Sequence, residues 1–253
     1  MRFASLGSGS RGNALLVEAG NTRLLIDAGF GPREMSRRLQ RLGVAGDDVD
    51  AVLVTHEHSD HVGGVFSCAR RFEWSVLLTH GTLAACRDPA ADARVTIIDS
   101  QQSFSVGDIC VHPFPVPHDA REPVQFVLAD GDRRLGVLTD AGHVTPHMVA
   151  MLNACDALVL ECNHDARMLA QGRYPRTLKR RIGGQWGHLD NAAAASLLVQ
   201  IGSENLRHVV AAHLSEENNR PALARAALSA VLGCAQDWIG VATQDEGFAW
   251  RDL

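Results

Sequence analysis

The stretch Thr55-His56-Glu57-His58-Ser59-Asp60-His61 places three histidines and one aspartate within six positions, in the pattern H-x-H-x-D-H. The preceding run, Ala51-Val52-Leu53-Val54, is short, apolar and rich in β-branched residues, which predicts a buried strand. The polar side chains therefore follow the carboxyl end of a strand, and Asp60 is expected to cap a helix that runs toward Phe66. Imidazole and carboxylate together favour borderline divalent cations, with Zn²⁺ first and Mn²⁺ or iron next. The stretch predicts a metal site.

The composition of the 253-residue chain is that of an ordinary soluble globular protein, with 46% hydrophobic and 21% charged residues. No run approaches the roughly 18 apolar residues of a membrane span, and residues 1–7 resemble a strand rather than a signal peptide. The six cysteines form no C-x-x-C pair and lie mostly in apolar runs, so we expect buried free thiols and a cytoplasmic protein.

Charge is informative locally rather than globally. The net charge of −5 creates no overall positive field that would attract nucleic acid. The segment 173–181, however, carries five positive charges and no negative one. It is either a track for a phosphate backbone or the solvated face of a helix.

Hydrophobic periodicity predicts strands and helices along the whole chain. No linker, repeat or low-complexity segment interrupts them, so we expect one domain, residues 1–253, with sheets inside and helices outside. The expected strands are 2–7, 13–19, 22–27, 51–54, 76–78, 95–98, 104–106, 109–117, 124–129, 134–139, 157–161, 208–212, 238–242 and 247–250, and the expected helices are 32–42, 61–72, a short one near Leu83, 146–154, 165–171, 176–182, 190–201 and 220–232.

Three further polar residues follow predicted strands, as rigidly held ligands must. His118 comes after the strand at 109–117, Asp140 after the strand at 134–139, and His213 after the strand at 208–212.

The H-x-H-x-D-H stretch resembles the signature of the metallo-β-lactamase superfamily. This resemblance implies an α/β (α+β) fold, an αββα sandwich of two mixed sheets flanked by helices, with a metal site at one edge. It also implies that Asp27 fixes the orientation of a ligand histidine, although the residues alone allow a capping or turn role. Carried over by position, the first metal is held by His56, His58 and His118, the second by Asp60, His61 and His213, and both by the bridging Asp140.

Two more clusters resemble the phosphodiesterase branch that includes RNase Z. In that branch a glutamate after a strand and a histidine before a helix act as a proton-relay pair, and the matching residues are Glu161 and His188. The alternative is that His188 only caps or packs at the helix start, with Glu161 paired to an arginine.

The resemblance extends over nearly the whole chain to the YycJ/WalJ (VicX) nuclease family, which implies a 5′→3′ exonuclease acting on DNA. The chain departs from the family pattern at Cys162 and Asp190, where serine is common. The shared motifs are Gly7-Ser8-Gly9-Ser10-x-Gly12-Asn13, Thr55-His56-Glu57-His58-x-Asp60-His61, His118-Asp119-Ala120-x-Glu122-Pro123, Asn163-His164-Asp165, Tyr174-Pro175, Leu178-Lys179-x-Arg181, Gly187-His188-Leu189-x-Asn191 and His213-Leu214-Ser215-x-Glu217-Asn218-Asn219.

The expected chemistry uses two divalent metal ions per chain, zinc or manganese, to turn a bridging water into hydroxide and to neutralise charge on a phosphodiester. Asp60 accepts a hydrogen bond from the nucleophile, and His188 with Glu161 protonates the leaving oxygen. The glycine-rich loop 7–13 can present N–H groups to an anion. The expected substrate contacts are Ser8, Ser10, Asn13, His164, Lys179 and Arg181.

Two other functions use the same ligands. A thioester or lactone hydrolase similar to glyoxalase II is the second enzyme class. A metal-bound regulatory or scaffold protein is the third possibility, but scaffolding has no need for seven converging ligands.

Overall fold

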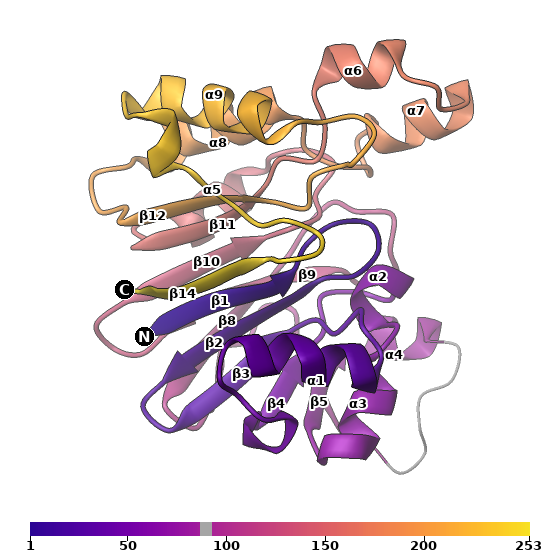
Figure 1. Cartoon of the computed structure of the whole chain (residues 1–253), viewed down its shortest axis with the longest axis vertical. Coiled ribbons are helices and arrows are strands. Elements are labelled where there is room, and N and C mark those ends of the chain that lie inside the picture. The colour runs from indigo at the N-terminus through magenta and orange to yellow at the C-terminus, as the bar shows by residue number, and fades with distance from the viewer. Residues whose placement is uncertain (87–92) are drawn as a thin grey trace.

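The computed structural model describes residues 1–86 and 93–253, and within them two seven-stranded sheets pack face to face (Figure 1). In spatial order, the first sheet consists of β14 (Phe248–Asp252), β1 (Arg2–Gly7), β2 (Ala14–Ala19), β3 (Thr22–Ile26), β4 (Ala51–Leu53), β5 (Ser75–Thr79) and β6 (Arg94–Ile98). The second consists of β13 (Gly240–Val241), β12 (His208–Ala212), β11 (Ala157–Glu161), β10 (Arg134–Leu138), β9 (Val124–Ala129), β8 (Ile109–Pro115) and β7 (Phe104–Val106).

Both sheets are mixed. Strands β3 to β6 run parallel in the first sheet, and β10 to β13 run parallel in the second. The remaining neighbours are antiparallel, including β1 with β14, which joins the two ends of the chain at Arg2 and Asp252. Because parallel strands end at the same edge of a sheet, the loops after β4, β10, β11 and β12 can meet at one end of the sandwich.

Helices cover the outer face of each sheet, which confirms the αββα architecture (Figure 1). The first sheet is covered by α1 (Pro32–Arg41) and α3 (Val65–Phe72), and the second by α5 (Pro146–Leu152), α8 (Asn191–Ile201) and α9 (Pro221–Leu232). The remaining α-helices are α2 (Ser59–Val62), α4 (His80–Ala85), α6 (Ala166–Gln171) and α7 (Arg176–Ile182). Among the described residues, no helix combines the length and apolar character that crossing a membrane requires.

Strand alternation explains how one sequence fills three apolar layers. In β4, Leu53 points into the layer between the sheets while its neighbour Val52 points toward α1 and α3. In β9, Phe126 enters the same central layer, and Val127 packs under the helices of the second sheet. All four side chains are fully buried, so the sheet positions are fixed on both faces.

The predicted helix 61–72 is wrong in one respect: it is two helices, α2 and α3, separated by Gly63 and Gly64. A side chain on Gly64 would collide with the backbone oxygen of Phe30, so only glycine allows the loop after β3 to approach this closely. Asp60 does not cap the helix, because it lies inside the first turn of α2 with its carboxylate near His213.

Smaller differences occur at strand ends. The predicted strand 238–242 is a 3₁₀ turn, Gln236–Trp238, followed by the two-residue β13. Strand β8 ends at Pro115, two residues earlier than expected. Capping of α8 follows the prediction, since the Asp190 side chain accepts the N–H of Ala193.

The cysteines are free thiols throughout the described chain. Cys68, Cys155 and Cys162 are buried, and burial raises the pKa of the Cys68 thiol to about 12 and that of Cys155 to about 11. These thiols serve as small apolar core groups.

Candidate metal centre and active site

Strand ends from both sheets bring the seven predicted ligands to one edge of the sandwich. The loop after β4 supplies four of them, and the loops after β8, β10 and β12 supply one each. They form overlapping groups in which all ligand atoms lie within 4.8 Å of one another. The groups are His56, His58 and His118; Asp60, His61 and His213; His56, His61 and Asp140; and Asp140, Glu161, His188 and His213.

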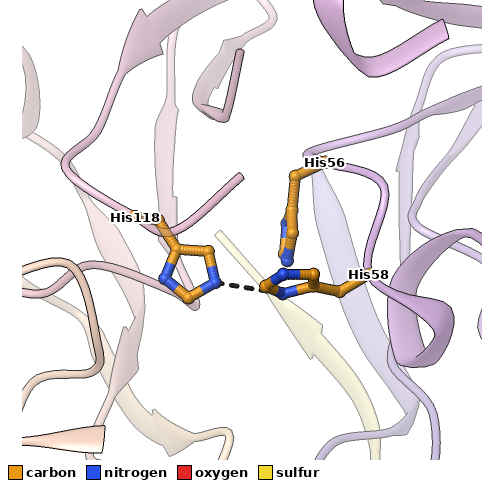
Figure 2. Close-up of side chains that lie close together, drawn as sticks. All are labelled: His56, His58 and His118. Atoms are coloured by element: carbon orange, nitrogen blue, oxygen red, sulfur yellow. Dashed lines mark hydrogen bonds between the residues drawn. The ribbon is translucent and has the colours of Figure 1, made fainter. Parts of the chain in front are cut away.

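The first group is a cluster of three imidazoles (Figure 2). His56 and His58 extend from one loop and His118 faces them from the other sheet, with ring centroids 4.6 to 5.0 Å apart. The Nδ1 atom of His58 lies 3.2 Å from Nε2 of His118. Two ligands bound at about 2.05 Å to a tetrahedral zinc ion would be separated by about 3.3 Å, so this spacing fits a shared metal.

Asp140 lies at the centre of the ligand set. Its Oδ2 is 3.2 Å from His61 Nε2, and its Oδ1 is 3.9 Å from His118 Nε2 and 3.2 Å from His213 Nδ1. Asp140 therefore faces both halves of the set, as a bridging carboxylate must.

Three buried ligand atoms have no hydrogen-bond partner within the described structure: Nε2 of His56 and both carboxylate oxygens of Asp140. A buried carboxylate without donors is costly, at about 1–3 kcal/mol or more for each unsatisfied group. Divalent cations would satisfy all three atoms together. The residues present therefore fit a divalent metal site.

The second ligand group lies beside the first. Oδ2 of Asp60 is 3.3 Å from His213 Nε2 and 3.5 Å from His61 Nε2. The rings of His56 and His61 are 4.3 Å apart, so the two groups are contiguous. Asp60 is partly exposed, while both histidines of this group are buried.

Partners behind the ligands fix which nitrogen faces the site. Oδ2 of Asp27 lies 2.7 Å from Nδ1 of His61, which is the orienting role expected for Asp27. Thr55 donates to Asp27 through both its backbone N–H and its hydroxyl, and this hydroxyl also lies 2.9 Å from Nδ1 of His56. His118 donates its Nδ1 proton to the Gly187 carbonyl at 2.9 Å. In each ring Nε2 remains available for the metal.

The backbone is strained at this edge. Asp27 has φ 61° and His213 has φ 53°, in the left-handed region that non-glycine residues rarely adopt. The fold holds both residues in this conformation, and such strain concentrates at functional sites.

Electrostatics favour ionised carboxylates and at least one neutral ring. Burial, with the nearby His61, lowers the pKa of His56 well below its usual value, so this imidazole is a neutral ligand. Burial opposes ionisation of Asp140 as well, but His213 and His61 hold its pKa well below the usual range. Burial also disfavours a charged His61, yet Asp140 and Asp27 raise its pKa well above the usual value.

Glu161 and His188 form a separate pair at the end of β11. Nδ1 of His188 donates a hydrogen bond to Oε1 of Glu161 at 2.8 Å. The same nitrogen lies farther from Oδ1 of Asp140, at 3.2 Å. Oε2 of Glu161 accepts the backbone N–H groups of Ala141 and Leu189. Glu161 thus has hydrogen-bond donors on both oxygens, unlike Asp140, so it serves as an acceptor for His188 rather than as a metal ligand.

The pair does not match the structural alternative considered from sequence. Asp190, not His188, caps α8, and the partners of Glu161 are histidine and backbone groups rather than an arginine. Burial disfavours a charged His188, but Glu161 and Asp140 raise its pKa to about 10.

A cavity of about 270 Å³ opens over the ligands. Its floor includes Asp60, Asp140, His188 and His213. Its wall is formed by α7 and the residues around it, and Ser10, His58, Asp119, Asn163 and Ser215 complete the lining. The lining residues from the α7 region are Tyr174, Leu178, Arg181, Ile182 and Gly187.

Two of the predicted substrate contacts, Ser10 and Arg181, line this cavity. Arg181 is held in place by Asp119, whose Oδ2 is 2.5 Å from its Nε. Asp119 Oδ1 in turn lies 3.7 Å from Nε2 of His58. The arginine is therefore oriented above the metal ligands rather than free in solution.

The other predicted substrate contacts lie outside the cavity lining and make contacts within the protein. The Ser8 hydroxyl accepts the backbone N–H of His213, and Asn13 closes its loop through Gly9 while approaching Asp60. Both side chains are buried. They support the ligands from behind because the glycine-rich loop packs against the metal site.

His164 and Lys179 lie outside the cavity lining for different reasons. His164 is buried beneath the α7 region, outside the cavity lining, with its Nδ1 lacking a hydrogen-bond partner in the described structure. Lys179 donates to the backbone oxygen of Ala170, which ties α7 to α6. Helical spacing turns Lys179 away from the face that carries Leu178 and Arg181.

Sequence reasoning missed the roles of Thr55, Asp119, Tyr174 and Gly187. All four lie within motifs shared with the nuclease family, but a motif does not say whether a residue touches a ligand ring or the substrate. Gly187 acts through its backbone carbonyl, which leaves no signal in its residue type.

Comparison with known proteins agrees with this geometry. The family model described as a β-lactamase superfamily domain matches residues 22–214. The exodeoxyribonuclease YycJ of Bacillus anthracis is 36% identical over 238 residues, covering 92% of this chain and 89% of that protein. The exodeoxyribonuclease WalJ of Streptococcus pneumoniae serotype 2 is 31% identical over 245 residues, covering 95% of this chain and 91% of that protein.

Among solved structures, the metallo-β-lactamase fold protein YhfI of Bacillus subtilis has a TM-score of 0.76 at 15% identity, covering 99% of both chains. This likeness shows the shared fold. The sequence matches go further, and the chain therefore belongs to the metallo-β-lactamase superfamily and, within it, to the family of YycJ and WalJ.

Proposed function

We propose that this protein is a nuclease of the 5′→3′ exodeoxyribonuclease type, a binuclear metal-dependent phosphodiesterase. The names of its relatives YycJ and WalJ support an exodeoxyribonuclease. The observation that carries the proposal is the location of His188, which lines the same cavity as the ligands, contacts Asp140 and is backed by the buried Glu161.

The ligand set has room for two metals. His56, His58 and His118 would hold the first, Asp60, His61 and His213 the second, and Asp140 both. Bound divalent ions, zinc or manganese, would lower the pKa of a water molecule and offset the charge of the phosphodiester. The carboxylate of Asp60 is partly exposed at the cavity floor, where it can orient a water by accepting a hydrogen bond from it.

His188 is suited to protonate the departing sugar oxygen. Its Nδ1–H group donates a hydrogen bond to Glu161, so Nε2 is left to face the substrate. The side chain is 21% exposed and lines the cavity. A positioned general acid contributes about 10²–10⁴-fold to such a reaction. Glu161 holds the ring and stabilises its positive charge.

Arg181 supports binding of a phosphate next to the scissile one. Asp119 fixes its guanidinium at the cavity wall, so one orientation is available without further loss of side-chain entropy. The substrate class that combines adjacent phosphates with poor leaving groups is a nucleic acid, and we infer DNA rather than RNA from the relatives.

A thioester or lactone hydrolase would use the same metal ligands. A thioester hydrolase would not need a histidine to protonate its leaving group, since a thiolate departs readily. The His188–Glu161 pair therefore favours the phosphodiesterase over a thioester hydrolase, and the names of the relatives favour it over a lactone hydrolase.

The test is a nuclease assay with protein that has been stripped of metal and reloaded separately with Zn²⁺, Mn²⁺ or Mg²⁺. The substrates are 5′-phosphorylated DNA, RNA of the same sequence, and lactoylglutathione. Release of mononucleotides from a 5′-labelled DNA before any shortening of the 3′ end is expected. Hydrolysis of lactoylglutathione without cleavage of DNA would overturn the proposal.

A further inference from the structure

The side chain of Trp186 is 61% exposed, which is unusual for a residue whose large apolar ring is normally covered. It lies between α7 and His188, in the segment 183–187. The next residue, Gly187, lines the cavity over the metal ligands. Trp186 is therefore an exposed aromatic residue directly next to the cavity lining in the chain.

The loop that carries Trp186 is fixed by its backbone. The Gly187 carbonyl accepts the Nδ1 proton of His118, and the Gln185 carbonyl accepts that of His143, both at 2.9 Å. The same loop packs so closely on Gly142 that a side chain there would collide with Gln185. The indole is thus exposed on a rigid support tied to a metal ligand.

A second aromatic side chain lies at the other end of α7. Tyr174, the only tyrosine in the chain, lines the cavity and is half-buried. Of the four cations on α7, Arg181 faces the cavity that Tyr174 lines. Aromatic rings beside a cation are the two components of a groove that binds single-stranded nucleic acid, because bases stack on the rings while cations hold the phosphates.

We propose that Tyr174 and Trp186 form a stacking platform for unpaired nucleobases of the strand being cleaved. In this arrangement the metal site and Arg181 bind the phosphates, and the two rings stack against the bases next to the scissile phosphate. This inference rests on the proposed nuclease function and adds the requirement that nucleotides next to the scissile phosphate are unpaired at the site.

The experiment compares two single-stranded, 5′-phosphorylated oligodeoxynucleotides with hydrolysis-resistant phosphorothioate linkages, bound to the metal-loaded protein. One has normal bases, and the other has abasic sugars at its first three positions. Trp186→Ala is expected to weaken binding of the normal strand by roughly 5- to 150-fold, the range for loss of one base–aromatic stack. Binding of the abasic strand should be unchanged, and Trp186→Phe should retain most of the affinity.

Trp238→Ala is the matched control. Trp238 is also exposed, but it precedes β13, which runs parallel to β12, so it lies at the edge opposite His213. Its removal should alter neither binding constant. Equal weakening of both strands by Trp186→Ala, or no weakening of either, would overturn the stacking platform, and unchanged unfolding midpoints would show that the variants are folded.

The two proposals fail separately. If the wild-type protein cleaves no DNA, the proposed nuclease function is wrong. A wild-type protein that cleaves DNA, with normal and abasic strands bound equally well by wild type and Trp186→Ala, would remove only the stacking platform.

Discussion

At the scale of single residues, the carboxylates of the site differ in their hydrogen-bond and ion-pair partners. Glu161 has donors on both oxygens, whereas Asp140 is buried without a hydrogen-bond donor on either oxygen in the described structure. Asp119 is paired with Arg181 at the cavity wall. The three acids therefore differ in what they contact: Glu161 supports a histidine, Asp140 faces both candidate ligand groups, and Asp119 holds an arginine at the cavity wall.

His188→Ala should cripple cleavage of DNA but spare bis-p-nitrophenyl phosphate, because nitrophenolate leaves without a proton. The expected loss on DNA is about 10²–10⁴-fold in kcat, from the usual contribution of a general acid. Steady-state rates on both substrates measure it, with metal content determined on the same samples. Equal losses on both substrates at intact metal content would exclude the acid role.

Asp140→Ala should reduce the metal content and abolish hydrolysis, since it removes the carboxylate that faces both ligand groups. Elemental analysis of the loaded protein measures the stoichiometry. Asp119→Asn is the control, because this carboxylate binds Arg181 and its replacement should leave two metals per chain. A single metal in fully loaded wild type would contradict the binuclear site.

At the scale of elements, α7 has two different faces. Leu178, Arg181 and Ile182 face the cavity, while Arg176 and Arg180 lie on the opposite side of the helix by its 100° spacing. The basic segment is therefore neither wholly a phosphate track nor wholly a solvated face. Its charges divide according to helix geometry.

Arg181→Ala should weaken DNA binding and flatten its salt dependence by about one counterion, because one phosphate contact is lost. Arg180→Ala removes the same charge from the opposite face and should change the slope little. Binding isotherms over a range of salt concentrations measure both. If the salt dependence of DNA binding has the same slope in both variants, the basic side chains of α7 are only a solvated face.

At the scale of the whole molecule, the metal centre joins the two sheets. His56 and His61 follow a strand of the first sheet, and His118, Asp140 and His213 follow strands of the second. Unfolding must separate these ligands, so bound metal should stabilise the sandwich as a whole.

Removal of metal should lower the unfolding midpoint, and reloading should restore it. At a free metal concentration 100 times its Kd, each site would contribute about 2.7 kcal/mol. Thermal unfolding with and without chelator measures the effect, and Asp140→Ala should respond much less than wild type. An identical midpoint for stripped and loaded wild type would show that the ligands do not join the sheets through metal.

Much of this molecule is determined by local sequence. The seven candidate ligand residues follow apolar runs that predict strands, and the resemblance of their motifs to the metallo-β-lactamase superfamily implied both the ligand set and the architecture of two sheets. The start of α8 needs no tertiary information either, since the side chain of Asp190 caps the N-terminus of this helix. These features depend on neighbours in the chain, so the chain order alone reveals them.

Other features were decided only by tertiary packing. The sequence suggested substrate contacts for Ser8, Asn13, His164 and Lys179, but the glycine-rich loop and α7 pack so that Ser8, Asn13 and Lys179 bond within the protein and His164 is buried. Asp119 and Trp186 acquire their roles from residues far away in the chain, through Arg181 and through the loop that binds His118. Which polar groups remain free for substrate depends on what covers each side chain, and that is set by contacts between distant segments.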